Sequence, residues 1–133
     1  MNLLLDTHVF LWWDRQDSAL SGDARHAIED PRNNVFVSAA SVWEIAIKRR
    51  LGKLAFQGSA SSAIGANGFH ELPIAPLDAE DAGNLAWRHN DPFDRLLVAQ
   101  ALRLGFVLLT ADRSIRSFGG VAQLPAERRG ATA

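Results

Sequence analysis

Residues 1–13, MNLLLDTHVFLWW, place one carboxylate, Asp6, between two apolar runs. The apolar segment from Asn2 to Leu5 predicts a short buried β-strand, and residues 8–13 predict the helix or turn that follows it. A charged group beside a buried strand costs free energy unless another group compensates for it. The remainder of the chain must therefore supply whatever compensates the charge of Asp6.

Short apolar segments alternate with amphipathic ones along the rest of the chain. The sequence predicts further strands at 35–38, 72–74, 106–110 and 121–124, the second of these at a sheet edge because it contains a proline. It predicts helices at 21–29, 38–51, 60–67, 78–87 and 91–104, and one helical turn at 112–118. This alternation indicates an α/β fold with a mostly parallel central sheet flanked by helices on both faces, in three α/β/α layers.

Length and composition narrow the class of protein. A chain of 133 residues suits a single domain, predicted at 1–124, followed by a polar C-terminal tail at 125–133. The formal net charge of -1 provides no global attraction to nucleic acid, so any such binding must be local. The absence of cysteine excludes disulfides and thiolate metal sites. No signal peptide and no bilayer-spanning segment is expected, which predicts a cytoplasmic protein with no membrane partner.

Four carboxylates are predicted to lie on one edge of the sheet. Asp6 directly follows the first strand, and Asp112 follows the strand at 106–110. Glu44 lies early in the helix after the second strand, and Asp94 lies in the first turn of a helix opened by Asp91 and a proline. Strand ends and the helix starts that follow them share one edge in right-handed βαβ units, where ligands bind.

Each carboxylate also has a purely structural interpretation. Asp6 and Asp112 fit helix N-caps, and Asp94 fits the positive end of its helix. Ser41 and Glu44 match a capping box. Taken singly, the structural and functional interpretations are equally good, but the structural ones leave the shared edge as a coincidence.

Several carboxylates within about 5 Å of one another would repel by a few kcal/mol at an effective dielectric constant near 20. A cation must offset this repulsion, or the carboxylates stay protonated. The chain has no cysteine, and no pair of histidines has ligand spacing. Oxygen donors alone suit Mg²⁺ or Mn²⁺, with water completing the coordination. The sequence therefore predicts a divalent metal site beside Asp6.

Four separated segments together resemble the PIN-domain family, and more closely the VapC-type toxins of bacterial toxin–antitoxin pairs. They are LLLDTHVFLW, SAASVWEIAIKRRLGKL, HNDPFDRLLVAQA and LLTAD, in matching order and spacing to about residue 118. The resemblance implies a parallel sheet and a Mg²⁺-dependent ribonuclease centre made of Asp6, Glu44, Asp94 and Asp112. It implies Asp6 and Asp94 as the direct ligands, with supporting hydroxyls on Thr110, Ser41 and Thr7. The match is weakest at residues 55–66, where relatives pair subunits and hold the antitoxin.

The activity implied is endoribonucleolytic. A metal-activated water would hydrolyse an RNA phosphodiester, leaving a 5′-phosphate and a 3′-hydroxyl, and Glu44 and Asp112 would complete the site through water or a second ion. A cognate antitoxin and a homodimer are the further partners that the resemblance implies.

Basic residues near the predicted edge are candidate contacts for RNA phosphates: Lys48, Arg95, Arg113 and Arg116. Lys48 lies four residues after Glu44, so an ordinary helical ion pair is an equal alternative. Arg95 is as well placed to neutralise its neighbour. The histidines His8 and His89 lie near the edge but are interpreted as surface or packing residues, and Trp43 and Trp87 as core residues.

Two other functions remain open from the sequence. One is a catalytically weak PIN-like binding or regulatory module, which the presence of all four acids disfavours. The other, less favoured, is an aspartyl-phosphate phosphotransferase or phosphatase with Asp6 as its nucleophile. Such enzymes need a second aspartate two residues later, where this chain has His8.

Overall fold

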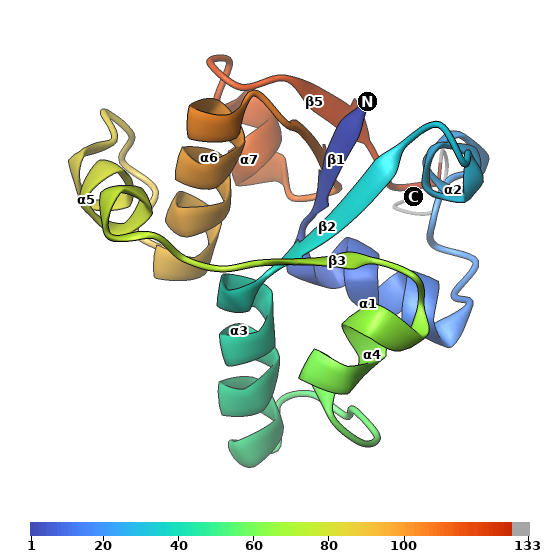
Figure 1. Ribbon diagram of the computed structural model, residues 1–133. Coiled ribbons are helices and arrows are strands. Elements are labelled where there is room, and N and C mark those ends of the chain that lie inside the picture. The colour runs from blue at the N-terminus through green and yellow to red at the C-terminus, as the bar shows by residue number, and fades with distance from the viewer. Residues whose placement is uncertain (129–133) are drawn as a thin grey trace.

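A computed structural model of the chain describes residues 1–128. Five parallel strands form one sheet in the order β3-β2-β1-β4-β5 (Figure 1). The strands are β1 (Asn2–Leu5), β2 (Asn34–Ser38), β3 (His70–Leu72), β4 (Val107–Thr110) and β5 (Gln123–Pro125). The predicted α/β class with a parallel sheet is confirmed. The strand predicted at 72–74 does lie at an edge, but it spans His70–Leu72 and ends before Pro73.

Helices cover both faces of this sheet (Figure 1). They are α1 (Thr7–Arg15), α2 (Gly22–Glu29), α3 (Ala39–Arg50), α4 (Ala60–Ala66), α5 (Pro76–Asn84), α6 (Pro92–Leu104) and α7 (Arg113–Ser117). Successive side chains of a strand point to opposite faces, so Leu3 and Leu5 pack against α1, α2 and α4, whereas Leu4 packs against α5, α6 and α7. The hydrophobic core is therefore divided into two layers by a buried sheet.

The N-terminal ends of α1, α3 and α6 gather at the edge where β1, β2 and β4 end (Figure 1). Helix α6 precedes β4 and runs against the strands, so its first turn reaches the same edge that α1 and α3 leave. Asp91 caps α6, and Gly105 ends it with a left-handed φ of 68°. The chain's local start and stop signals thus bring four distant segments to one edge.

Two predictions about side chains and boundaries are wrong. The helix predicted at 78–87 spans Pro76–Asn84, and Asp78 does not cap it but lies buried in its first turn. Its carboxylate accepts a hydrogen bond from the Ala75 backbone N–H (2.8 Å) and pairs with Arg103. Trp43, predicted in the core, is instead 52% exposed, and its ring packs edge-on against Phe93 of α6.

Part of the segment predicted as a polar tail is tied to the domain. The Ala126 N–H donates to the carbonyl of Thr110 (3.0 Å), and the Arg128 N–H donates to the carbonyl of Ala19 (2.8 Å). Ala126 is fully buried. The last five positions of the predicted tail, 129–133, lie outside the described residues.

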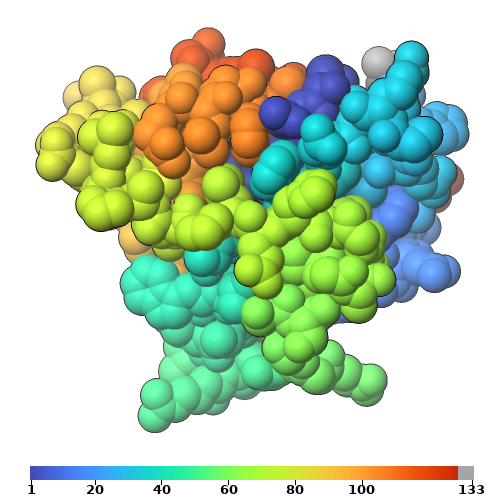
Figure 2. Space-filling view, viewed as in Figure 1, coloured from blue at the N-terminus to red at the C-terminus, as the bar shows by residue number. Residues whose placement is uncertain are grey.

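Helix α3 and the segment after it extend away from the rest of the molecule (Figure 2). This extension carries the exposed side chains of Trp43 and Leu51. Among the described residues, no helix combines the length and apolar character needed to cross a membrane.

Candidate metal centre

Asp6 leaves the end of β1 and is almost completely buried. Its Oδ1 accepts a hydrogen bond from the Val9 N–H (2.9 Å), which caps α1, and its Oδ2 accepts one from the Thr110 hydroxyl. Burial raises the pKa of Asp6, and the negative charge of Asp112 raises it further, against the two hydrogen bonds. The structural interpretation of Asp6 as a cap is correct. The capping hydrogen bond does not, however, offset the cost of burying the negative charge of Asp6.

Asp112 lies just beyond the end of β4 and is half-buried. Its Oδ1 caps α7 by accepting from the Ile115 N–H (3.0 Å), and its own N–H donates to the Thr110 hydroxyl (3.0 Å). Thr110 therefore contacts both Asp6 and Asp112. The hydroxyl of Thr110, at the end of β4, thus links the carboxylate of Asp6 to the backbone of Asp112.

Glu44 is buried in the second turn of α3. Its Oε1 accepts a 2.6 Å hydrogen bond from the Thr7 hydroxyl, which also lies 3.0 Å from the hydroxyl oxygen of Ser41. The alternative of a capping box is wrong, because α3 begins at Ala39 and is capped by Ser38. Glu44 is therefore held by a side chain from α1 and points to the edge of the sheet.

Lys48 forms the helical ion pair that the sequence left open, donating to Oε2 of Glu44. The hydrogen bond to Glu44 raises the pKa of Lys48, and the charges of Asp91 and Asp94 raise it further. Lys48 is thus a cation already directed at the acidic residues.

Asp94 occupies the first turn of α6 without capping it, since the Asp91 carboxylate accepts from the Phe93 and Asp94 N–H groups (2.9 and 3.0 Å). Its Oδ2 lies 2.7 Å from Nε2 of His89. Burial raises the pKa of Asp94 to about 7, and the charges of Asp91 and Asp112 contribute, against the hydrogen bond to His89. Asp94 is therefore a second carboxylate with insufficient compensating charge.

The predicted carboxylates gather at one edge of the sheet. Single donor atoms of His89, Asp94 and Asp112 all lie within 4.8 Å of one another. Asp112 acts electrostatically on both Asp6 and Asp94. Glu44 joins the group through Thr7, the residue after Asp6.

A hard divalent cation fits this set of donors. The carboxylate oxygens come from separate, well-packed elements, so their geometry is fixed before any ion binds. Burial and neighbouring carboxylates raise the pKa values of Asp6 and Asp94, so a nearby cation would stabilise the ionised forms of both. Oxygen-rich sites of this kind suit Mg²⁺ or Mn²⁺.

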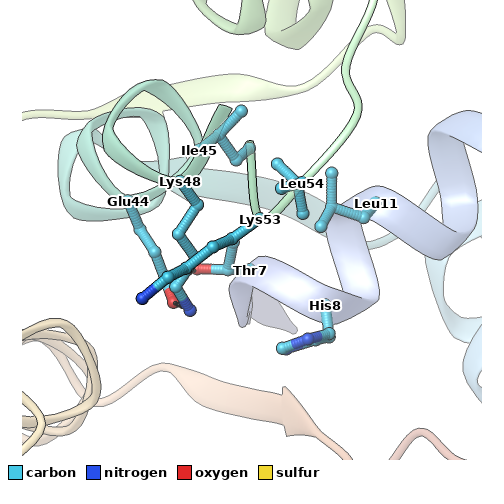
Figure 3. Close-up of a pocket in the computed structure, with 8 residues that line it drawn as sticks. All are labelled: Thr7, His8, Leu11, Glu44, Ile45, Lys48, Lys53 and Leu54. Atoms are coloured by element: carbon cyan, nitrogen blue, oxygen red, sulfur yellow. Dashed lines mark hydrogen bonds and ion pairs between the residues drawn. The ribbon is translucent and has the colours of Figure 1, made fainter. Parts of the chain in front are cut away.

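A cavity of about 250 Å³ opens beside Glu44, between α1, α3 and the segment that follows α3. Figure 3 shows the side chains of Lys48 and Lys53 reaching toward the Glu44 carboxylate, with His8 on the opposite side of the cavity. The remaining wall is mostly apolar, formed by Leu11, Ile45 and Leu54. The cavity thus combines a cationic side with apolar walls next to the acidic residues.

The other predicted phosphate contacts differ in their surroundings. Arg113 and Arg116 are exposed on α7, close to Asp112. The prediction for Arg95 is wrong, because its guanidinium donates to backbone carbonyls of α5 and of the segment 85–89 instead of facing solvent. The alternative, that Arg95 neutralises Asp94, is also wrong, because the guanidinium donates to these carbonyls instead.

The sequence interpretation missed His89 at the acidic centre. It contacts Asp94 because the segment between α5 and α6 turns back over the first turn of α6. The one available signal is its position two residues before the Asp91 cap, close enough to reach the helix start. Lys53 also lines the cavity beside Glu44, although it is not among the predicted phosphate contacts.

The chain is similar to known proteins over most of its length. The PIN domain family model matches residues 3–121. Ribonuclease VapC22 of Mycobacterium tuberculosis is 33% identical over 118 residues, covering 86% of this chain and 90% of the relative. Among solved structures, VapBC2 from Rickettsia felis bound to a DNA fragment from its promoter superposes with a TM-score of 0.65 at 11% identity, covering 96% of this chain and 100% of that one. VapC20 of M. tuberculosis, a sarcin–ricin loop cleaving toxin, superposes with a TM-score of 0.57 at 16% identity, covering 92% and 99% of the two chains.

Proposed function

The chain belongs to the PIN domain family, and we propose that it is a metal-dependent endoribonuclease that acts as the toxin of a toxin–antitoxin pair. One observation carries the proposal: carboxylates from four separate elements lie at the edge where the parallel strands end. Donor atoms of Asp94 and Asp112 are within 4.8 Å of each other, Asp112 acts electrostatically on Asp6, and Thr7 links Glu44 to the residue after Asp6. The 33% identity to a ribonuclease over nine-tenths of that relative's length supports the same activity.

Asp6 and Asp94 are the proposed direct ligands, and Asp112 and Glu44 complete the centre through water or a second ion. A divalent cation held by these acids would lower the pKa of a water molecule and offset negative charge on the phosphate. The chain's own contribution is orientation: Thr110 and the Val9 N–H fix Asp6, and Thr7 fixes Glu44. Lys48 and Lys53, with Arg113 and Arg116 farther along the edge, are the proposed contacts to RNA phosphates.

The finer parts of the proposal concern the metal, the partners and the location. Mg²⁺ is the proposed cofactor, with Mn²⁺ as a substitute, because the four acids supply hard oxygen donors. A cognate antitoxin and a second copy of the chain are the proposed protein partners, and solved toxin–antitoxin complexes share the fold. Because the proposed substrate is RNA, the cytoplasm is the proposed location of the activity.

Purified protein, freed of antitoxin, is incubated with total RNA and Mg²⁺ or Mn²⁺, in parallel with EDTA-treated protein and with Asp6→Asn. We expect cleavage by the wild type with either metal, and loss of cleavage with EDTA or in the variant. Absence of metal-dependent cleavage, or equal cleavage by the variant, would favour a binding or regulatory module.

Expression in bacteria tests the toxin assignment separately. The wild-type chain should arrest growth when expressed without antitoxin, and Asp94→Asn should relieve the arrest. Unaltered growth on expression of the wild type would contradict a toxin function, while leaving an endoribonuclease possible. Trapping of a phosphorylated Asp6 would instead support the phosphotransferase alternative.

A further inference from the structure

The segment from Leu85 to His89, between α5 and α6, is held in place by Arg95. A guanidinium has five N–H donors, and Arg95 directs them at five backbone carbonyls, those of Ala82, Gly83, Leu85, Trp87 and His89, at 2.7 to 3.4 Å. Every donor of the side chain is therefore used to fix backbone. Such an arrangement makes Arg95 a positioning residue for this segment and leaves it no donor for a phosphate.

The ring of His89 is fixed from a second direction. It packs against the Trp87 ring with centroids 4.8 Å apart, and Trp87 packs in turn against Phe118 at 5.1 Å. The His89 carbonyl accepts from Arg95, while Nε2 of the ring lies 2.7 Å from Oδ2 of Asp94. Backbone and ring are thus both constrained, and Nε2 of the imidazole is directed at Asp94 of the acidic centre.

The distances suit a shared cation. Neighbouring ligands of an octahedral ion bound at about 2.1 Å are about 3 Å apart, and opposite ligands are about 4.2 Å apart. Nε2 of His89 is 2.7 Å from Asp94, and the donor atoms of His89, Asp94 and Asp112 all lie within 4.8 Å. His89 and Asp94 lie five residues apart at the start of α6, whereas Asp112 follows β4, so the approach of Asp112 to this pair depends on tertiary packing.

We propose that His89 is a nitrogen ligand of the divalent cation that Asp94 binds, with Asp112 close to both. The inference rests on the proposed metal-dependent function and adds to it a ligand outside the four acids. Imidazole nitrogen favours later first-row ions, whereas carboxylates and water suit Mg²⁺. A site with one imidazole should therefore bind Mn²⁺ more tightly than Mg²⁺, and that preference should depend on His89.

Pulsed electron paramagnetic resonance of the Mn²⁺-loaded full chain tests the ligand directly. Nitrogen coupling to Mn²⁺ is expected in the wild type, lost in His89→Gln and kept in His26→Gln, which changes an exposed histidine on α2. Labelling the wild type with ¹⁵N-histidine should convert the coupling to that of ¹⁵N. This second measurement identifies a histidine ligand even if His89→Gln does not fold.

Titration with Mn²⁺ and with Mg²⁺ supplies a second readout. In His89→Gln, Mn²⁺ affinity should fall at least about tenfold, with a smaller change for Mg²⁺. Arg95→Lys, which offers three donors in place of five, should weaken Mn²⁺ binding in the same direction.

The outcomes separate the two proposals. Mn²⁺ binding and RNA cleavage by a wild type without nitrogen coupling would overturn the role of His89, which would then only donate a hydrogen bond to Asp94, and would leave the proposed function standing. Coupling that persists unchanged in folded His89→Gln would overturn it too. A wild type that neither binds Mn²⁺ nor cleaves RNA would overturn both proposals.

Discussion

The hydroxyl of Thr7 donates a 2.6 Å hydrogen bond to the carboxylate of Glu44 and thereby joins the first turn of α1 to α3. Both side chains are buried. Since Thr7 directly follows Asp6, this bond couples the acid at the end of β1 to the acid on α3. The position of Glu44 at the centre thus depends on a neutral side chain 37 residues away in sequence.

Thr7→Val should destabilise the protein by about 1.5 to 3 kcal/mol, because it removes a hydrogen bond to a buried carboxylate while keeping the side-chain shape. Thr7→Ser keeps the hydroxyl and is the matched control. Urea unfolding of both variants measures the difference. Equal free energies of unfolding for the two variants would show that the bond contributes nothing.

Asp6→Asn should abolish RNA cleavage without destabilising the metal-free protein. The pKa of Asp6 is raised in the folded protein, so its ionised form costs stability at any pH above its unfolded value. Asparagine removes that charge, and its amide oxygen can still accept from the Val9 N–H and cap α1. Thermal unfolding in EDTA should give Asp6→Asn a Tm equal to or above that of the wild type.

Asp6→Ala is the control for the cap, because it removes the cap as well as the charge. Loss of the cap should lower the free energy of unfolding by about 1 kcal/mol. An Asp6→Asn protein with a Tm in EDTA below that of the wild type would contradict the account of buried charge.

The ion pair between Asp78 and Arg103 should stabilise the fold in a pH-dependent way. Burial acts to raise the pKa of Asp78, but hydrogen bonds from Arg103, Ala75 and Gln100 outweigh it and lower the pKa below its ordinary 3.8. A lowered folded pKa means that the stabilisation is fully present above pH 3.8 and is lost as the pH falls through the folded value.

Asp78→Asn should therefore cost about 2 kcal/mol at pH 7, and the cost should shrink as the pH falls below 3.8. Chemical unfolding of both proteins across this range measures the change. A difference that does not vary with pH would mean that the charge of Asp78 is not what stabilises the fold.

Lys53→Gln should weaken RNA binding and reduce its salt dependence, because Lys53 lines the cavity beside Glu44. Removing one lysine–phosphate interaction with single-stranded RNA lowers the slope of log K against log salt by about 0.7. The measurement uses the Asp6→Asn background, so that bound RNA is not cut. Arg32→Gln, an exposed change at the opposite edge of the sheet, should leave the slope unchanged. A similar weakening in both variants would indicate non-specific attraction.

Much of the fold could be predicted from local signals. Ser21, Asp91 and Gly105 mark helix ends in the sequence and occupy those positions in the structure. The start of α5 could not be fixed so well, because Pro76 and Asp78 are both good residues for a first turn and the sequence does not rank them. Only the buried contact with Arg103, 25 residues later, decides that Asp78 lies inside the helix.

The gathering of the four acids could be predicted because it follows from parallel topology, which fixes where strands end and helices begin. The surroundings of Arg95 and Trp43 could not. Arg95 binds carbonyls of a segment whose path is set by α5 and α6 together, and the exposure of Trp43 depends on how α3 packs against Phe93 of α6. Both outcomes depend on non-local packing that no local pattern encodes.

A crystal of the metal-free protein soaked in Mn²⁺ provides the most direct measurement of the central claim. Anomalous scattering at the manganese edge should place an ion at bonding distance from the carboxylate oxygens of Asp6 and Asp94, the proposed direct ligands, with Asp112 beside it. A fully soaked crystal with no anomalous peak there, or with manganese bound only elsewhere on the protein, would contradict it.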